Sequence, residues 1–216
     1  MYARGEDYHV VLREKLEQLV QKTRERIDIP FQSRICVDTS AIIERELAAA
    51  AGIGWIGKNT MVLHQSLGSF FFLGTVITDL ALVPDTPVPD HCGTCTRCLD
   101  ACPTDAFPKP YVMDASRCIS YLTIEHRDDI EPELSDKIGD WLFGCDDCQT
   151  VCPYNRDAPE TTESRFQTEG APNLDDIQRW DPATYRQAVR GKATERAKLH
   201  MWQRNAEIVR RNLKKT

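Results

Sequence analysis

The sequence predicts an α+β fold in three parts: a mixed α/β region, a cysteine-rich module and a helical, basic C-terminal segment. Helix-like and strand-like patterns mix before the first cysteine run. Eight of the nine cysteines lie between residues 92 and 152, and basic residues gather near the C-terminus. These three observations place the expected domains at residues 1–85, 86–157 and 158–216.

The first part contains both helix and strand signals. An amphipathic pattern predicts a helix over 7–26, and a short strand is expected over 34–38. A run of good helix formers then predicts a helix over 39–51, which begins at a hydroxyl-bearing cap and ends at a glycine. Two further strands are expected over 61–64 and 69–78. A proline-rich linker leads from there to the cysteines.

Two cysteine runs, each closed by a Cys-Pro pair, define the second part. The spacing C-x2-C-x2-C-x3-C-P is that of bacterial ferredoxins, in which three cysteines of a run ligate one [4Fe–4S] cluster and the fourth ligates the other cluster. A ferredoxin-like domain with two clusters is therefore expected. The expected ligands of cluster one are Cys92, Cys95, Cys98 and Cys152. The expected ligands of cluster two are Cys102, Cys118, Cys145 and Cys148.

Zinc is the alternative metal, because zinc sites also use paired C-x2-C elements. A zinc site does not require the repeated x3-C-P ending, whereas a ferredoxin-type cluster site contains it, so the pattern favours iron–sulfur clusters. The second run departs from a small carrier ferredoxin, since 26 residues separate Cys118 from Cys145. We expect this insertion to pack against a larger body. The ninth cysteine, Cys36, is expected to be a small buried hydrophobic residue.

The third part is basic although the chain has a net charge of −6. From Asp181 to Thr216 there are ten Lys/Arg and three Asp/Glu, whereas the rest of the chain holds 17 and 30. A basic end on an acidic body predicts a phosphate-bearing partner; a solvated amphipathic helix is the alternative. No apolar run is long enough for a membrane span, and clustered metal-type cysteines indicate the reducing cytoplasm.

Several stretches of the chain resemble epoxyqueuosine reductases, the cobalamin-dependent iron–sulfur enzymes of tRNA queuosine synthesis. They are YARGEDYH at 2–9, VDTSAIIERELAAAAGIGWIGKNT at 37–60, CGTCTRCLDACPTDAF at 92–107, RCISYLTIEHR at 117–127 and FGCDDCQTVCPYN at 143–155. The cysteine spacing fits many ferredoxin-like proteins, and the VDTS and GWIGKNT segments narrow it to this family. Family members have a further region before the YARG segment. The expectation is therefore an N-terminally truncated member, whose first part is the C-terminal part of a cobalamin-binding α/β domain.

The resemblance implies reductive removal of the epoxide oxygen of epoxyqueuosine in the tRNA anticodon loop, giving queuosine. Two [4Fe–4S] clusters would pass electrons from an external donor to cobalamin, and the family's proton donor corresponds to Asp38. Without the resemblance, Asp38 would be interpreted as a helix cap. The residues that the resemblance places at cobalamin are Asp38, Lys58, Asn59, Thr60, Val62, Ser120 and Asp146. A monomer without membrane contact is expected.

Single-stranded RNA loops are bound by basic and aromatic side chains, so tRNA contacts are expected from the basic C-terminal segment, at Arg186, Arg190, Arg210 and Arg211. Two other functions stay open. A ferredoxin-like electron carrier without its own cobalamin would use the same cysteines. A reductive dehalogenase also joins cobalamin to two cubanes, but it is disfavoured because the sequence starts without a twin-arginine leader and carries the VDTS aspartate.

Overall fold

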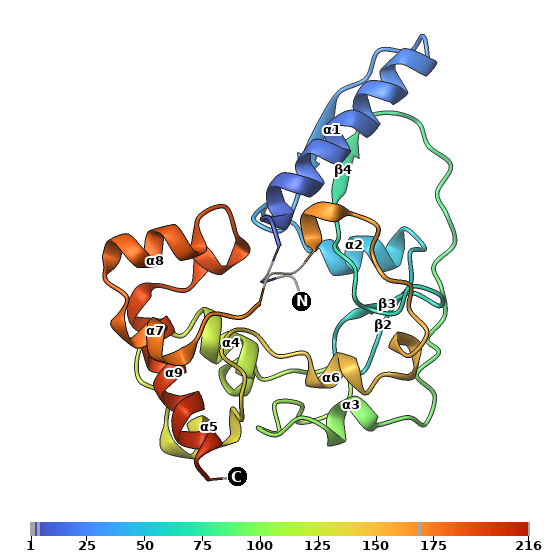
Figure 1. Cartoon of the computed structure of the whole chain (residues 1–216). Helices are drawn as coiled ribbons and strands as arrows, with labels where there is room; N and C mark the ends of the chain where they lie inside the picture. The colour runs from blue at the N-terminus through green and yellow to red at the C-terminus, as the bar shows by residue number, and fades with distance from the viewer. Residues whose placement is uncertain (1–2, 4, 168–169, 216) are drawn as a thin grey trace.

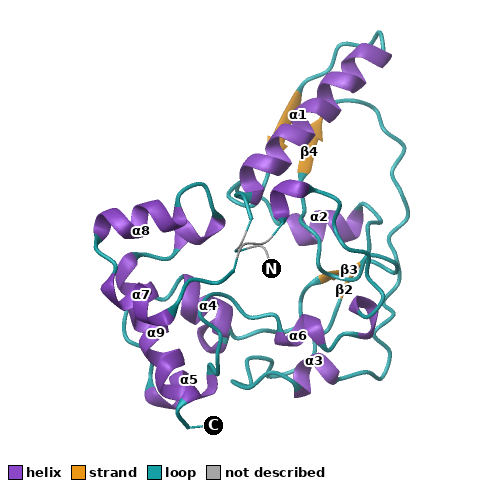
Figure 2. Cartoon of the chain, viewed as in Figure 1, coloured by secondary structure: helices purple, strands orange, loops and turns teal. Residues whose placement is uncertain are grey.

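The computed structural model describes residue 3, residues 5–167 and residues 170–215. It is an α+β fold in which helices predominate (Figure 1, Figure 2). Figure 1 shows α1 (Tyr8–Arg26) and a small sheet at the top, the short helices α3 (Arg97–Asp100) and α6 (Asp147–Thr150) at the lower right and the C-terminal helices at the left. None of the helices in the described part combines the length and apolar character needed to cross a membrane.

The helix predicted over 7–26 is α1, and its start is capped by the Asp7 carboxylate, which accepts a hydrogen bond from the His9 amide. Behind it, β1 (Ser33–Cys36) pairs antiparallel with β4 (Thr75–Thr78). Both strands are shorter than predicted, and β4 covers only the end of the 69–78 stretch. Cys36 is fully buried, as expected of a small hydrophobic residue.

The helix predicted over 39–51 begins at Glu44 instead, as α2 (Glu44–Ala50). Asp38 has a φ of 50°, in the left-handed region, so the chain turns sharply before it can enter a helix. The N-cap of α2 is Ile43, and no side chain caps it. The predicted hydroxyl cap at Thr39 or Ser40 is therefore wrong, and so is a helix-capping role for Asp38.

After α2, β2 (Trp55–Ile56) and β3 (Val62–Leu63) form a short antiparallel pair. The two strands hold a tight loop between them, and the backbone at Gly54 lies so close to Leu63 that an added Cβ would collide with the Leu63 oxygen. The loop residues Lys58 and Asn59 are buried. Residues 55–63 thus form a compact hairpin whose loop carries two buried polar side chains.

The cysteine module consists of short helices joined by turns. They are α3 (Arg97–Asp100), η1 (Ala115–Arg117), α4 (Ile119–Ile124), α5 (Pro132–Lys137), α6 (Asp147–Thr150) and η2 (Pro153–Asn155), where η marks a 3₁₀ helix. The insertion between the second run's first two cysteines supplies α4 and α5. The polar crossing predicted after the module contains η3 (Ser164–Phe166).

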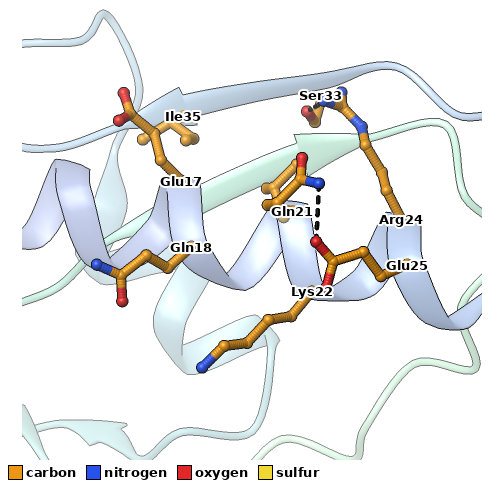
Figure 3. Close-up of a pocket in the computed structure, with 9 residues that line it drawn as sticks. Glu17, Gln18, Gln21, Lys22, Arg24, Glu25, Ser33 and Ile35 are labelled. Carbon is orange, nitrogen blue, oxygen red and sulfur yellow. Dashed lines mark hydrogen bonds between the residues drawn. The ribbon is translucent and has the colours of Figure 1, made fainter.

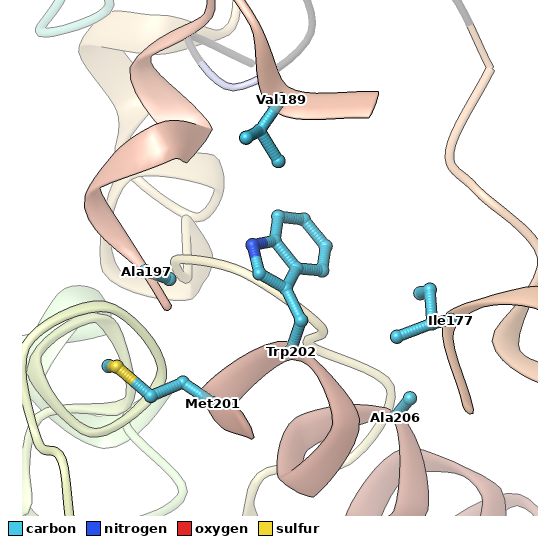
Figure 4. Packing of buried hydrophobic residues seen from close by; sticks show 6 residues of the cluster. All are labelled: Ile177, Val189, Ala197, Met201, Trp202 and Ala206. Atoms are coloured by element: carbon cyan, nitrogen blue, oxygen red, sulfur yellow. The ribbon is translucent and has the colours of Figure 1, made fainter. Parts of the chain in front are cut away.

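Beyond η3, the described part of the C-terminal segment contains four further helical pieces. They are α7 (Leu174–Arg179), α8 (Pro182–Val189), η4 (Ala193–Arg196) and α9 (Leu199–Leu213). Trp202 of α9 is buried among side chains of the other pieces (Figure 4); the cluster consists of Ile177, Val189, Ala197, Met201, Trp202 and Ala206. Because α9 supplies three of these residues, it is a core helix and not a solvated amphipathic one.

The far end of α9 packs on the insertion of the cysteine module. Ile208 joins a second apolar cluster with Ile119, Leu122, Ile130 and Ile138. Side chains of α9 also bond the insertion's backbone: Asn205, which is 1% exposed, donates to the carbonyl oxygens of Thr123 and Leu142. The insertion therefore packs on the C-terminal segment of the same chain.

Candidate iron–sulfur and acid–base site

The two cysteine loops have matching backbone geometry. The Cys102 amide donates to the Leu99 oxygen at 3.3 Å, and the Cys152 amide donates to the Gln149 oxygen at 3.0 Å. The residues that precede α3 and α6 have φ −126°, ψ 7° and φ −113°, ψ 8°. α3 and α6 pack against each other. The last cysteine of each run therefore follows a short helix, and these two helices lie against each other.

The thiols of the two cysteine runs lie close enough to shift one another's pKa. Burial raises the pKa of the Cys98 thiol, and the neighbouring thiols of Cys152, Cys92 and Cys95 raise it further. Burial also raises the pKa of Cys148, to about 12, with contributions from Cys118, Cys98 and Cys102. Thiols that crowd one another in this way are difficult to ionise unless a cation takes the charge.

Cysteine thiols are the type of ligand that an iron–sulfur cluster uses. Four thiols per group is the ligand count of a [4Fe–4S] cluster. Among the described residues, no group of three or more His, Cys, Asp or Glu side chains is arranged to hold a single metal ion. A cubane cluster takes its ligands at separate corners of a cube, whereas a single ion draws all its ligands to one point. The thiols of a cubane site therefore need not converge on one point.

The loop between β2 and β3 fastens both cysteine loops to the N-terminal part. Lys58 Nζ donates to the carbonyl oxygens of Gly93, at 2.7 Å, and Cys95, at 2.9 Å. Asn59 Nδ2 donates to the Cys148 oxygen at 3.1 Å. Both side chains are less than one-tenth exposed. The Lys58 ammonium and the Asn59 amide thus both point to the cysteine loops.

A second contact joins the same two regions. Asn155, just after the second Cys-Pro pair, accepts a hydrogen bond from the Ser69 amide at 2.6 Å and donates to Ser69 Oγ at 2.9 Å. The neighbouring Gly68 has a φ of 67°, and a side chain there would meet the Asn155 amide oxygen. The N-terminal part and the cysteine module are therefore joined through specific polar contacts.

Asp38 lies on the turn before α2, and its side chain is 58% exposed. Its Oδ2 is 3.1 Å from His9 Nε2, while His9 Nδ1 is 2.7 Å from Asp7 Oδ1. The Asp38 amide donates to a Glu44 carboxylate oxygen at 3.0 Å. Partial burial lowers the pKa of His9, but the hydrogen bonds to the Asp7 and Asp38 carboxylates outweigh it and raise this pKa overall. His9 is therefore favoured in its charged form, with an N–H toward each carboxylate.

Three of the residues expected at cobalamin meet at one loop, although they are far apart in the sequence. Asn59 bonds the Cys148 oxygen, and Ser120 Oγ donates to the Cys145 oxygen at 3.4 Å. Asp146 lies in the same loop, where its Oδ1 accepts from Gln149 Nε2. Thr60 has a left-handed φ of 64°, and Val62 is buried in the hairpin. These residues thus lie along the junction between the N-terminal part and cluster two's loop.

The four arginines expected to contact tRNA do not lie together. Arg186 and Arg190 are exposed, and the carbonyl of Gly191, next to Arg190, accepts a hydrogen bond from the Asp7 amide at 2.9 Å. Arg210 instead bonds Asp175 at 2.5 Å and Glu207 at 3.2 Å. Arg211 bonds Asp136 at 3.1 Å. Of the four, Arg190 is next in the chain to a residue, Gly191, that contacts the Asp7–His9–Asp38 group.

Two residues near Asp38 were not singled out from the sequence. His9 lies within the YARGEDYH stretch, and the Asp-x-His spacing was the available signal. Arg196 forms a two-point ion pair with Glu125, and that hydrogen bond chiefly raises its pKa, with further contributions from Asp38 and Tyr8. No local motif marks Arg196, because its relation to Asp38 depends on how the C-terminal segment folds back.

A groove on the outer side of α1 and β1 is separate from this site. Its lining is mostly polar or charged (Figure 3) and consists of Glu17, Gln18, Val20, Gln21, Lys22, Arg24, Glu25, Ser33 and Ile35. None of the predicted site residues belongs to it.

Two family models match this chain, one at the cysteine loops and one at the segment that contains His9 and Asp38. A family model described as a 4Fe-4S double cluster binding domain matches residues 91–155. A second model, described as epoxyqueuosine reductase QueG, DUF1730, matches residues 1–39, which include His9 and Asp38. The two models therefore cover the cysteine loops and the carboxylate–histidine group separately.

Similar proteins align with nearly the whole chain. An epoxyqueuosine reductase of Leadbetterella byssophila is 44% identical over 97% of this chain and 69% of its own length. One of Xanthomonas campestris is 42% identical over 96% of this chain and 59% of its own length. A crystal structure of epoxyqueuosine reductase with an epoxyqueuosine-modified tRNA stem loop is similar with a TM-score of 0.92, at 35% identity over 99% of this chain and 57% of that chain. This chain thus spans between 57% and 69% of the length of these proteins.

Proposed function

This chain belongs to the epoxyqueuosine reductase family, and we propose on that premise that it serves the reductive removal of the epoxide oxygen from epoxyqueuosine in tRNA, giving queuosine. One observation carries the proposal. An exposed carboxyl on a left-handed turn, Asp38, occurs in the same chain as two cysteine loops, and the hairpin after α2 bonds both of them. The chain thus combines an acid with an electron-transfer module.

The reaction has a simple balance. Two C–O bonds of the epoxide break, a carbon–carbon double bond forms, and the oxygen leaves as water after taking up two protons and two electrons. A one-electron donor outside the chain would supply the electrons, one at a time, to the clusters. The protein's own task is to conduct these electrons and to deliver a proton to the departing oxygen.

The proposed ligands of cluster one are Cys92, Cys95, Cys98 and Cys152, and those of cluster two are Cys102, Cys118, Cys145 and Cys148. The influence of Cys152, Cys92 and Cys95 on the pKa of Cys98 supports the first set, and the match of residues 91–155 to a double cluster binding domain supports the presence of two clusters. The packing of α3 on α6 would keep the two clusters close enough for electron exchange.

Cobalamin is proposed as the second cofactor. When bound, it supplies a cobalt centre that receives electrons from the clusters and acts on the epoxide. Asp146 and Thr60 offer polar groups at the junction described above, which fits the amide-bearing edge of a corrin. Val62 is buried and Ser120 Oγ already donates to the Cys145 oxygen, so these two residues would shape the junction. Lys58 and Asn59 would act indirectly, by holding the cysteine loops, because their side chains point to those loops.

Asp38 is proposed as the proton donor to the departing epoxide oxygen. One of its carboxyl oxygens is bonded to His9, and the side chain remains exposed enough to meet a substrate. His9 would position this carboxyl, since it is itself fixed by Asp7 at the start of α1. The strained backbone at Asp38 is consistent with a functional position.

tRNA is proposed as the substrate carrier, with Arg190 as a phosphate contact. Arg190 is exposed and lies on the turn that bonds the Asp7 amide. The solved relative that holds an epoxyqueuosine-modified tRNA stem loop supports this proposal. Arg186 is also exposed, on α8 of the same segment.

The proposal is tested with anaerobically purified chain, a chemical reductant, cobalamin and an epoxyqueuosine-containing tRNA stem loop. We expect the modified nucleoside to lose one oxygen atom, measured by mass spectrometry, only when cobalamin and iron are both present. Conversion that proceeds equally without cobalamin would contradict the cofactor assignment, and no conversion with both cofactors bound would contradict the activity.

An electron carrier is the second candidate function. It is favoured by the contacts of Lys58 and Asn59, two of the residues expected at cobalamin, whose side chains instead hold the cysteine loops. Ultraviolet–visible spectra with and without added cobalamin separate the two functions. An enzyme would show cobalamin bands that stay with the protein through gel filtration, whereas a carrier would show the iron–sulfur absorbance alone.

A further inference from the structure

Trp55 lies in β2 between the two ends of cluster one's proposed ligand set. Its side chain is 3% exposed. The ring of His91, next to Cys92, meets the indole edge-on with a centroid separation of 5.0 Å, and the ring of Tyr154, close to Cys152, does so at 4.9 Å. Trp55 is therefore fixed in orientation by aromatic residues beside two of the four thiols.

The indole N–H of Trp55 is an unusual group in this position. Within the described part of the chain, Trp55 Nε1 is buried and has no hydrogen-bond partner that meets standard geometry. An indole nitrogen can only donate, so it needs an acceptor. Buried donors in native structures nearly always have one, and an orphan of this kind points to a group that binds there.

We propose that Trp55 donates its indole N–H to the sulfur of Cys92 when that sulfur ligates cluster one, and that this hydrogen bond raises the reduction potential of cluster one. The inference rests on the proposed iron–sulfur function. Reduction adds negative charge to the cluster and its thiolates, and a donor to a ligand sulfur stabilises that charge. Trp55 is thus a positioning residue that acts through Cys92.

The electrostatics of Cys92 agree with this contact. Burial raises the pKa of the Cys92 thiol, while the nearby Trp55 indole and Lys58 amide oppose that rise. The indole therefore lies near the sulfur, without a hydrogen bond of standard geometry to it. Both donors come from the hairpin of the N-terminal part. The hairpin would therefore fasten the first cysteine loop and also set the potential of the cluster that it holds.

Cluster two has donors of a different origin. Its proposed ligand Cys102 accepts from the Ala106 amide at 3.3 Å and lies 3.6 Å from the Thr104 hydroxyl, both within the cysteine module. The N-terminal part would therefore affect the two clusters differently. Removal of the Trp55 donor should change the potential of cluster one and spare that of cluster two.

The experiment is a redox titration of the full chain, loaded anaerobically with iron and sulfide and followed by electron paramagnetic resonance. Trp55→Phe keeps an aromatic ring but lacks the donor. Incorporation of benzothienylalanine at position 55 keeps nearly the whole indole shape without the N–H. Thr104→Val removes the hydroxyl near cluster two, and Trp202→Phe removes another buried indole N–H without a partner, in the C-terminal core.

The wild-type chain should show two one-electron waves. Both changes at position 55 should move one wave to more negative potential by roughly a tenfold change in the ratio of reduced to oxidised cluster, about 59 mV. Thr104→Val should move the other wave, and Trp202→Phe neither. Full iron content with both waves unmoved by the isostere would overturn the inference while leaving the proposed function intact. Absence of clusters from the loaded wild type would overturn both.

Discussion

Lys58 Nζ lies 2.7 Å from the carbonyl oxygen of Gly93, so a buried ammonium group of the N-terminal part is inserted into the first cysteine loop. The same group reaches the Cys95 oxygen. A short stretch of the hairpin therefore fixes a loop that lies more than thirty residues later in the chain. This contact gives a testable consequence for stability and metal loading.

Lys58→Met should destabilise the chain by about 2–3 kcal/mol, because it removes charged hydrogen bonds and leaves two buried carbonyl oxygens without their donor. For a chain of this size that corresponds to a fall in Tm of several degrees. The measurement is thermal unfolding by circular dichroism. Lys22→Met on the exposed side of α1 is the matched control and should change Tm little. Equal Tm values for both variants would contradict the fastening role.

Single ligand substitutions should remove one cluster at a time. Cys98→Ser is expected to damage cluster one and Cys118→Ser cluster two, so iron should fall from about eight to about four atoms per chain in each variant. Iron and sulfide analysis of anaerobic protein measures this. Cys36→Ser, which changes a cysteine outside both groups, should retain the full complement. Two zinc ions and no iron in the wild type would refute the cluster assignment itself.

The double cluster binding domain was predictable because cysteine spacing is a local property of the sequence. The His9–Asp38 contact was not, since it joins residues 29 positions apart and depends on how α1 packs beside the turn. The start of α2 was misplaced because good helix formers after Thr39 conceal the left-handed turn at Asp38. The basic C-terminal pattern gave no sign that Arg210 would be neutralised by Asp175, on another helix.

The His9 contact makes stability depend on pH. Its pKa is raised in the folded state, so the stabilising contribution is fully present below the ordinary value of 6.5 and is lost as pH rises through the folded-state value. Urea unfolding should therefore show stability falling as pH rises above 6.5. His9→Gln should remove this component and flatten the profile, while His200→Gln, on exposed surface elsewhere, should leave it. Identical profiles for wild type and His9→Gln would exclude the linkage.

Arg190 and Arg210 should differ in their effect on tRNA binding. Arg190→Gln removes an exposed charge beside the Asp7–His9–Asp38 group, so the slope of log K against log salt should become shallower by about 0.7–0.9 for one lost phosphate contact. Arg210→Gln should leave the slope unchanged, because its guanidinium is held by Asp175 and Glu207. Fluorescence anisotropy of a labelled stem loop over a salt series measures both. If Arg210→Gln changed the salt slope and Arg190→Gln did not, the phosphate contact would lie at the end of α9 instead.

Asp38→Asn should abolish turnover and spare structure. Asparagine tolerates a left-handed backbone as aspartate does, so the φ of 50° is not a source of unfolding. Its amide oxygen can still accept from His9 Nε2. Only the acidic proton is lost, and general acid catalysis typically contributes about 10² to 10⁴ in rate. The measurement is single-turnover conversion of an epoxyqueuosine-containing stem loop under a chemical reductant.

The matched control is Asp7→Asn, which makes the same chemical change on the other side of the His9 ring. It should slow turnover less than tenfold, because Asp7 acts on Asp38 only through His9. Iron content, cobalamin occupancy and stem-loop affinity are measured first in both variants, so that a lost cofactor is not mistaken for a lost acid. If Asp38→Asn keeps all three and turns over within tenfold of wild type, the proton comes from another group, and the exposed turn at Asp38 has only a structural role.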